Sequence, residues 1–499
     1  MGSEQFRRQL RQEADLWRAE GLIEETQYQQ LVERYQLHSL DVAARNRFIV
    51  ILLGLGSVLI GLGVIIFVAA NWQELPRFWK VTLLLSLFTG VNIVGFYESQ
   101  HAQSGRQRLG QGLLLLGALI LGANMALMGQ TFHQGGAFYE LLLAWGLGVL
   151  VMAYGLSSTS LGILSFVIVV FGYWGGWWDL AWGSWSALTA REWSWALLVV
   201  QHMPILAGFM FVPLAYGCRS GWIFSLGASA SVISLVANLR PFSLNLFSSE
   251  AHGWVMAIAL ALPPALLWGY DDSFWLYGNL PWLSHLYRSH PRLPPPRSFQ
   301  PLARSLALIF LGIAFYLPSS GWFWELLTPN STSQIAIRGF PWIDVVVLSG
   351  ITLVAWVRLL RSNPRTNRSE LLATRVVGAM IAIAAITIFW HVRIQAIPMM
   401  ATAIFNLLLF LLAIGLMREG LGQGRRRAFW GGMVLAILRI FSWFFLFSTD
   451  LLFKSLIFIL GGAGIILIGL WFERHVQTLT PTSKLHQQTQ SSPPQEDAS

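Results

Sequence analysis

The chain has 499 residues, of which 55% are hydrophobic and only 11% are charged. Soluble domains carry about 25% charged residues, so this composition excludes a single water-soluble core and predicts that lipid is the solvent. The net charge of +9 suggests nucleic acid, but the basic residues follow a pattern that a membrane explains better. The single cysteine, Cys218, excludes an intramolecular disulfide framework and a Cys-based zinc site.

Residues 1–47 are polar and predict a cytoplasmic helical hairpin (3–37) followed by a linker. Gly21 is expected to end the first helix in a left-handed turn. Glu24 and Glu25 open the second helix, where the helix dipole favours acidic side chains. Because a hairpin this small buries little by itself, we expect it to pack on itself, to cap the membrane domain, or to bind a cytoplasmic protein partner.

Fourteen apolar runs follow, and they predict an all-α, polytopic membrane bundle over residues 48–472. A helix needs about 17–25 such residues to cross about 30 Å of hydrocarbon. The runs are 48–70, 78–97, 109–129, 137–155, 159–178, 193–217, 221–239, 253–270, 302–317, 342–360, 371–390, 397–417, 427–447 and 451–472. Residues 271–301 are expected to form a cytoplasmic loop, and residues 473–499 to form a disordered cytoplasmic tail.

The distribution of basic residues predicts the orientation of these spans. With both termini in the cytoplasm, 25 of the 33 Lys and Arg residues fall in cytoplasmic segments or at the cytoplasmic ends of spans, and seven fall in outer segments or at the outer ends of spans. Cytoplasmic loops accumulate basic residues, and the bias does not invert along the chain, as it would after a missed span. We therefore expect the bacterial plasma membrane, with cytoplasmic termini, and no nucleic-acid partner.

Ionisable and polar residues inside spans indicate functional sites because they are costly in lipid. Five of them are expected near the outer ends of spans and could line an outward-facing polar cavity: Asn124, Gln130, His133, Glu140 and Arg439. Arg439 requires an anion or several carbonyl oxygens, and we predict that it pairs with Glu140, with Asp344 and Asp450 as alternatives. The competing interpretation is that these residues only tie helices together.

Prolines predict two broken helices. His202 and Pro204 lie in the span 193–217, and Pro263 and Pro264 lie in the middle of 253–270. Proline lacks an N–H and frees a carbonyl of the preceding turn. Interrupted helices mark substrate sites in transporters, although large helical bundles also contain them for packing.

Motifs for soluble-enzyme chemistry are missing from the sequence. No phosphate-binding Gly-x4-Gly-Lys-Ser/Thr loop and no His-Glu-x-x-His occur, so we expect no cofactor and no metal, and we lean against an enzyme. Asp271 and Asp272 are expected to act as a cap at the membrane surface. The tryptophan-rich segment 174–195 is typical of an interfacial anchor, with a platform for a sugar or lipid headgroup as the alternative.

Four stretches resemble a family of bacterial membrane proteins, domain of unknown function 2157. They are Leu10-x6-Trp17-x3-Gly21-Leu22-Ile23 with Gln27, Leu31 and Tyr35; Asn71-Trp72-x3-Pro76 with Lys80; Gly122-Ala123-Asn124-x-Ala126-Leu127-x-Gly129-Gln130; and Asp450-Leu451-Leu452-x-Lys454-Ser455-Leu456 through Gly461. The resemblance implies a multi-pass membrane protein and assigns no catalytic residues.

Three functions stay open. The first is a transporter or flippase-like protein for a small or lipid-linked substrate, which the helix number and the broken helices favour. The second is a membrane-embedded glycan or lipid transferase at the outer face, with Glu140 or His133 as the base. The third is a non-catalytic assembly or sensory protein that acts through the amino-terminal hairpin. The sequence does not predict an oligomeric state.

Overall fold

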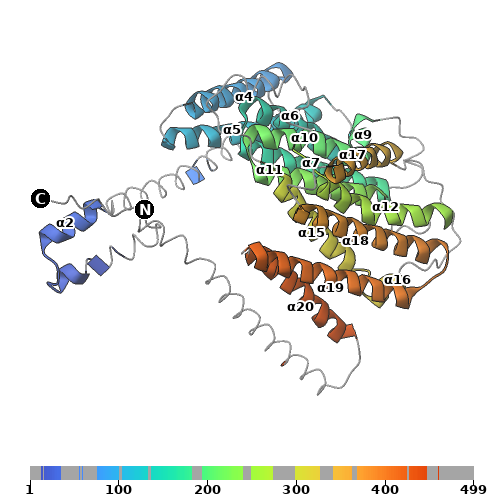
Figure 1. Cartoon of the computed structure of the whole chain (residues 1–499). Helices are drawn as coiled ribbons and strands as arrows, with labels where there is room; N and C mark the ends of the chain where they lie inside the picture. The colour runs from blue at the N-terminus through green and yellow to red at the C-terminus, as the bar shows by residue number, and fades with distance from the viewer. Residues whose placement is uncertain are drawn as a thin grey trace, which may run out of the picture. The chain divides into compact units, whose positions relative to one another are not determined.

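The computed structural model of the protein is helical wherever it describes the chain, and no strand occurs in those parts (Figure 1). The described residues are 10, 13–14, 16–34, 55–56, 59, 76–100, 104–132, 136–182, 194–239, 249–272, 298–325, 341–361, 368–423, 426–446 and 459. The chain divides into two compact units, residues 1–135 and residues 136–499. The predicted all-α fold is therefore confirmed.

The first unit contains the turn that the sequence predicts at Gly21, whose φ is +71°. The N–H of Leu22 donates to the carbonyl of Trp17 (2.8 Å), and the N–H of Gly21 donates to the carbonyl of Arg18 (3.2 Å). These are the two hydrogen bonds of a Schellman motif, which closes a helix on a left-handed residue. The next helix, α2 (Glu25–Arg34), therefore starts only a few residues later.

Side chains hold this hairpin together across the turn. Nε of Arg18 lies 2.7 Å from a carboxyl oxygen of Glu25, and the guanidinium of Arg18 lies 5.1 Å from the centre of the Tyr28 ring. Ala14 and Val32 are buried, although each lies on a small helix. The hairpin thus has contacts of its own, and these include a cation–π pair.

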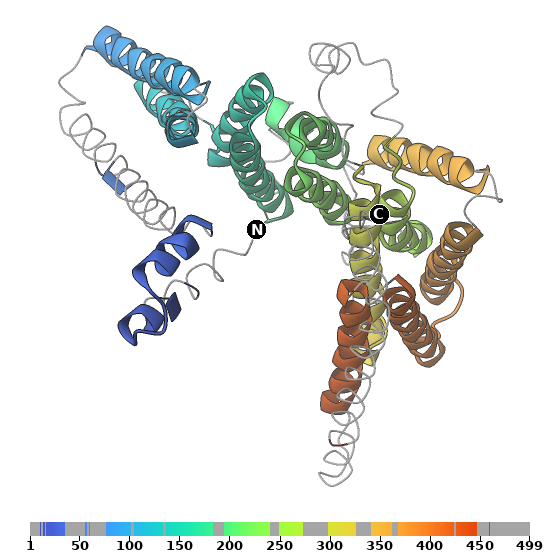
Figure 2. The ribbon, with the colours of Figure 1, turned by 60° about the vertical axis from the view of Figure 1, so that its left-hand side comes forward.

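A helical pair, α4 (Arg77–Ser99) and α5 (Ser104–Thr131), completes the described part of the first unit. Both figures of the ribbon show the two helices side by side (Figures 1 and 2). A Cβ on Gly110 would lie 2.3 Å from the backbone nitrogen of Ser99, so only glycine permits this approach. Close backbones between membrane helices are typical where residues are small.

The second unit is a larger helical bundle. Its helices are α6 (Phe138–Leu156), α7 (Thr159–Trp182), α9 (Trp195–Gln201), α10 (Met203–Cys218), α11 (Gly221–Leu239), α12 (Ser249–Trp268), α15 (Gln300–Tyr316), α16 (Gly321–Glu325), α17 (Trp342–Arg361), α18 (Arg368–Arg393), α19 (Pro398–Gln423) and α20 (Arg426–Leu446). Each predicted span within the described residues coincides with one helix, or with the pair α9 and α10. The spans 48–70 and 451–472 lie outside the described residues, apart from isolated positions.

Short left-handed turns join consecutive helices into hairpins. Ser157 (φ 46°) links α6 to α7, and Arg219 (φ 51°) links α10 to α11. Within these hairpins glycines bring the helices close: a Cβ on Gly227 of α11 would lie 2.5 Å from the Cβ of Phe211 on α10. The α10–α11 hairpin then packs with α12 and α17. A core cluster of α11, α12 and α17 residues fills the space between these three helices, and it contains Leu235, Leu239, Val255, Ala259, Leu262, Val345 and Leu348.

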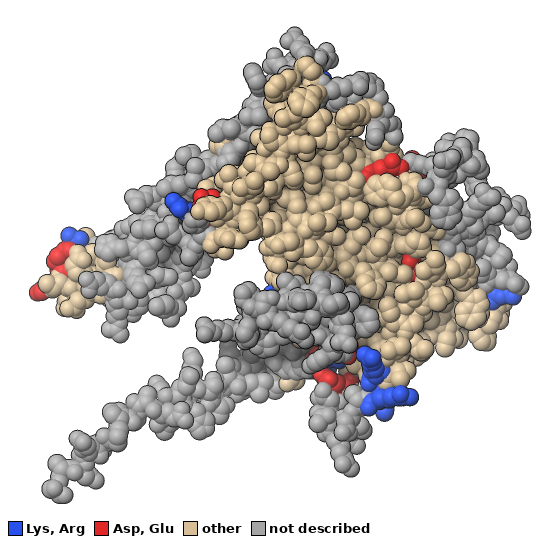
Figure 3. All heavy atoms as spheres, turned by 90° about the horizontal axis from the view of Figure 1, so that it is seen from above, with Lys and Arg blue, Asp and Glu red and all other residues tan. Residues whose placement is uncertain are grey.

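Eight of the described helices are long and apolar enough to cross a membrane, or nine if α9 and α10 form one bent span. The eight are α4, α5, α6, α7, α11, α17, α18 and α19, while α12 and α15 are shorter apolar helices. Large apolar side chains such as Val151, Phe171 and Ile386 are exposed along these helices. Charged residues are sparse on the face in Figure 3. An apolar surface of this kind is stable in lipid, not in water.

Candidate functional site

The bundle contains one sharply broken helix, at the position where the sequence predicts it. The helices α9 and α10 meet at His202 with a bend of 84°. Pro204 is the second residue of α10 and has no N–H to donate to the carbonyl of Val200. The break at His202 and Pro204 is therefore a direct consequence of the sequence.

Asn238 of α11 satisfies the carbonyls that the break frees. Its Nδ2 donates to the carbonyl of Val200 (3.1 Å) and to that of Gln201 (2.9 Å), while its Oδ1 accepts from the hydroxyl of Tyr173 (2.9 Å) on α7. On the far side of the break, the hydroxyl of Ser231 donates to the carbonyl of Pro204. Two helices thus hold the break open, because buried backbone groups need hydrogen-bond partners.

His202 faces a buried acid at the start of α17. Its Nδ1 lies 3.0 Å from Oδ1 of Asp344, whose side chain has no exposed surface, whereas the side chain of His202 is 26% exposed. The second carboxyl oxygen of Asp344, Oδ2, is buried and has no hydrogen-bond partner in the structure. An imidazole and a carboxyl group therefore share one hydrogen bond at the broken helix.

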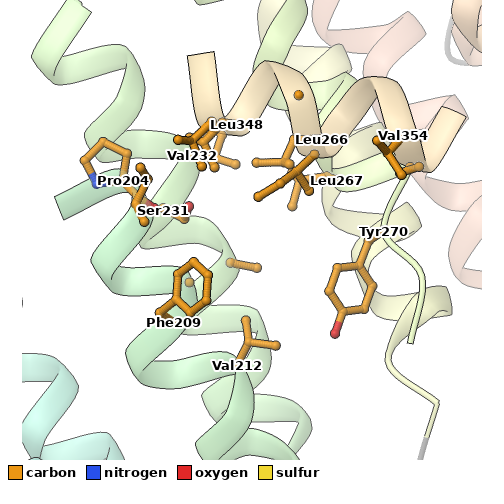
Figure 4. Close-up of a pocket in the computed structure, with 18 of the residues that line it drawn as sticks. Pro204, Phe209, Val212, Ser231, Val232, Leu266, Leu267, Tyr270, Leu348 and Val354 are labelled. Carbon is orange, nitrogen blue, oxygen red and sulfur yellow. Dashed lines mark hydrogen bonds between the residues drawn. The ribbon is translucent and has the colours of Figure 1, made fainter. Parts of the chain in front are cut away.

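An apolar groove of about 400 Å³ runs between α10, α11, α12 and α17, and Pro204, two residues after His202, lines it (Figure 4). Its walls include Phe209 and Val212 from α10, Val232 from α11, Leu266 and Leu267 from α12, and Leu348 and Val354 from α17. Figure 4 shows these side chains facing one another across the space. The volume lies in the range of about 300–1,000 Å³ that is usual for ligand pockets.

The two ends of the groove differ in polarity. Pro204 lines one end and follows His202 by two residues. At the other end lie Tyr270, Asp271 and Arg358, and Arg358 is exposed. Asp344 and Arg358 stand 14 residues apart on α17, which is about 21 Å along a helix axis. The groove is therefore apolar along its length and charged at the end that Asp271 and Arg358 line.

Aromatic and acidic residues fix the Arg358 end. The hydroxyl of Tyr270 lies 2.8 Å from that of Tyr216, which donates to Asp272. Asp272 also accepts the backbone N–H groups of Phe299 (3.0 Å) and Gln300 (3.4 Å) at the start of α15. Asp272 thus caps the start of α15, while the predicted role of Asp271 and Asp272 at the membrane surface stays a prediction. No group of three or more His, Cys, Asp or Glu side chains that could hold a metal occurs among the described residues.

The second predicted break does not form. The helix α12 continues from Ser249 to Trp268 with Pro263 and Pro264 inside it, and Gly269 still donates to the carbonyl of Ala265 (2.9 Å). Both prolines are buried, and packing by neighbouring helices compensates for the hydrogen bonds that proline removes inside a membrane helix. The prediction of an interrupted helix was therefore wrong at this position, and only the break at His202 adjoins the groove.

Arg439 of α20 is buried among neutral groups, with 3% of its surface exposed. Its Nε donates to Oδ1 of Asn406 (2.6 Å), its Nη1 to the hydroxyls of Ser320 and Ser442 (3.2 Å each), and its Nη2 to the carbonyl of Ser319 (2.7 Å). The predicted ion pair with Glu140 was wrong: α6 and α20 lie well apart in Figure 1. Oxygen dipoles replace the anion, so Arg439 ties α20 to α19 and to the turn before α16.

The other residues of the predicted polar cavity each have surroundings of their own. Asn124 is buried in α5 and donates to the carbonyl of Leu84 on α4 (2.9 Å), so it ties two helices of the first unit. Gln130 is exposed at the end of α5, and His133 lies outside the described residues. Glu140 accepts a hydrogen bond from Ser194 (3.4 Å), the residue that caps α9.

A protein-family model matches the amino-terminal part of the chain. Residues 15–162 match the family of predicted membrane proteins DUF2157. The match covers the hairpin turn at Gly21, the Asn71-Trp72 motif and the stretch 122–130, so the resemblance noted from these residues is confirmed. The similar stretch at Asp450 lies beyond the matched residues.

The DUF2157 match ends before the groove. The break at His202, the carboxyl group of Asp344 and the walls of the groove all follow residue 162. A search of curated proteins and a search of solved structures each returned no match. The groove and the broken helix of the second unit are therefore the features that indicate a function.

Proposed function

We propose that this integral membrane protein crosses the bacterial plasma membrane about fourteen times, with both termini in the cytoplasm. The helices found at the predicted spans support the count, and the bias of Lys and Arg toward one set of loops supports the orientation. In this topology His202 and Asp344 lie toward the outer face, and Arg358 lies toward the cytoplasm. The groove then runs along the membrane normal rather than along the surface.

The groove favours an amphipathic substrate, a lipid or a lipid-linked molecule, and a transporter or flippase-like function. A single observation carries this proposal: the long apolar space between α10, α11, α12 and α17 ends at Asp271 and Arg358. An acyl chain fits apolar walls, and a polar headgroup fits the charged end, because arginine is a good donor to phosphate and carboxylate oxygens. The broken helix at the opposite end supports movement rather than storage.

Two glycines provide a matched test of lipid binding. Gly350 lines the groove, and a Cβ there would meet no atom within 4 Å, so Gly350→Phe is expected to fill the groove without disturbing its walls. Gly415 on α19 is equally open but lies away from the groove, so Gly415→Phe is the control. Lipid retained by the purified proteins is measured by native mass spectrometry. Wild type and Gly415→Phe should retain lipid that Gly350→Phe has lost; equal retention by all three contradicts the proposal.

Transport is tested in vesicles that contain a phospholipid with a fluorescent headgroup. Wild-type protein should increase the fraction of the probe that an external quencher reaches with time, and Gly350→Phe should slow this exchange at least tenfold relative to Gly415→Phe. Chemical conversion of the lipid, rather than movement, would instead support the transferase. Retained lipid without exchange or conversion would point to an assembly or sensory role.

A further inference from the structure

The groove and its charged end account for the proposed lipid binding, but they give no role to the pair of His202 and Asp344. The fold holds this pair in an energetically unfavourable environment. Asp344 is fully enclosed, one of its oxygens has no donor, and the imidazole sits where α9 and α10 separate by 84°. A buried polar atom without a hydrogen-bond partner destabilises the fold, so its presence calls for an explanation.

The net charge of the pair determines whether it binds a proton. With the imidazole neutral and the carboxyl group ionised, the pair carries one negative charge in an enclosed apolar site, which is unfavourable. One added proton makes the pair neutral overall, whether it rests on the imidazole or on the carboxyl group. Because the imidazole is 26% exposed and the carboxyl group is not, the proton enters and leaves through His202.

No other described charge contacts the carboxyl group. Four of the described helices pack against α17. The helices α10 and α11 carry no acidic or basic residue, and α12 begins with Glu250 and His252. The helix α18 carries Arg368, Glu370 and Arg375 near its start and His391 and Arg393 at its end. His391 is engaged elsewhere, since its Nδ1 accepts from Ile397 (3.0 Å) and its ring packs on Trp324. Among the described residues, His202 is therefore the ionisable side chain in contact with the carboxyl group of Asp344.

We propose that His202 and Asp344 form a proton-binding site at the helix break, and that its occupancy is linked to occupancy of the groove. Pro204 and Leu348 line the groove, and they lie two and four residues after His202 and Asp344 (Figure 4). Loss of the proton weakens the contact between the break and α17, and the two walls of the groove belong to these elements. Linkage is reciprocal, so a proton that favours one form of the groove is itself bound more tightly in that form. The link to a ligand rests on the proposed function; the proton site does not.

The proton site is tested on the full-length protein by its melting temperature across pH. Unfolded chains lose the histidine proton near pH 6.5, at about the ordinary value. A folded pair that keeps its proton above this pH makes the wild-type melting temperature fall as pH rises, on the order of 2 °C per pH unit for one proton. Asp344→Asn removes the buried charge, so its melting temperature should stay flat over the same interval after the common background is subtracted.

Glu370→Gln is the matched control, because Glu370 is an exposed acid whose ion pair with Arg304 (3.5 Å) lies at the surface. It should keep the pH dependence of the wild type. An Asp344→Asn protein that retains this dependence overturns the proton site. If Asp344→Asn does not fold, infrared spectra of wild type and His202→Gln replace it. A band of a protonated carboxyl group that shifts in His202→Gln supports the site, and identical spectra overturn it.

The link is tested by lipid retention at two pH values on either side of the transition. Wild type should retain different amounts at the two values, and Asp344→Asn should retain the same amount at both. The two proposals fail separately. Gly350→Phe should lose lipid but keep the pH dependence of melting, so equal lipid retention by Gly350→Phe and wild type contradicts the groove alone. An unaltered pH dependence in Asp344→Asn contradicts the proton site alone.

Discussion

Arg439 is a buried charged residue whose hydrogen-bond partners are all neutral. An isolated cation at mid-depth of a bilayer costs about 2.5–3.5 kcal/mol even on insertion scales. The sequence therefore predicts an acidic partner for Arg439. The structure instead supplies two carbonyl oxygens and two hydroxyls, from Ser319, Asn406, Ser320 and Ser442. Nothing in the sequence marks these four residues as a set, because they come from three places in the chain: the turn before α16, α19 and α20.

A double-mutant cycle distinguishes the observed partners from the predicted one. Arg439→Met leaves Oδ1 of Asn406 without its donor, while the carbonyl of Ser319 keeps the amide of Asn406 (2.9 Å), so we expect a loss of about 1–3 kcal/mol in stability. Combined with Asn406→Leu, the loss should be smaller than the sum of the single effects by about 0.5–3 kcal/mol. Combined with Glu140→Gln, the effects should add. Thermal unfolding in one detergent provides the measurement, and coupling to Glu140 instead of Asn406 would contradict the structure.

Among the elements, the broken helix illustrates what periodicity and proline can and cannot predict. The same signal, proline within an apolar run, marks His202-Met203-Pro204 and Pro263-Pro264, yet only the first position breaks. At the first position, the side-chain amide of Asn238 donates hydrogen bonds to the two carbonyls that the break frees. At the second, the helix stays continuous within the packed bundle. The difference lies in tertiary partners, which local sequence does not contain.

The candidate site divides in the same way. Sequence located His202 and Pro204 because proline acts locally. It did not join His202 to Asp344, since a contact between residues 142 positions apart depends on how α10 and α17 pack. The apolar groove was likewise invisible, because its wall residues have the composition of every other span. Span positions, in contrast, follow from length and hydrophobicity alone, and the described helices agree with them.

Asn238 should matter as much as the proline to the broken helix. Asn238→Leu removes the donor to Val200 and Gln201 and the acceptor for Tyr173, and its volume is similar. We expect a loss of about 1–3 kcal/mol per unsatisfied buried group, seen as a lower melting temperature. The control is Asn92→Leu on α4, whose amide donates within its own helix to Phe88 (2.8 Å) and should lose less. Equal losses would mean that the break does not depend on Asn238.

At the scale of the whole molecule, the amino-terminal hairpin has contacts of its own, and we predict that it is a separate module. Its Schellman turn, the Arg18–Glu25 ion pair and the Arg18–Tyr28 contact all lie within residues 17–28. Deletion of residues 1–37 should therefore leave the second unit folded and inserted, with a melting temperature within about 2 °C of wild type. Fluorescence-detected size exclusion in detergent checks this. Aggregation or degradation of the shortened protein would show that the hairpin belongs to the core.

The proposed topology makes a prediction about parity that does not depend on the boundaries of individual spans. With about fourteen spans, reporters fused at residue 1 and residue 499 should both be cytoplasmic. Reporters inserted in 98–108 and 361–370 should also be cytoplasmic, while those in 130–136 and 318–341 should be outside. The physical reason is the basic bias: 25 Lys and Arg residues on one side against seven on the other. A helix such as α12 or α15 that fails to cross would invert every reporter after it, so a single change of side between 318–341 and 361–370 identifies α17 as a true span. If residues 1 and 499 report opposite sides, the number of spans is odd, and His202 with Asp344 could then no longer be assigned to the outer face.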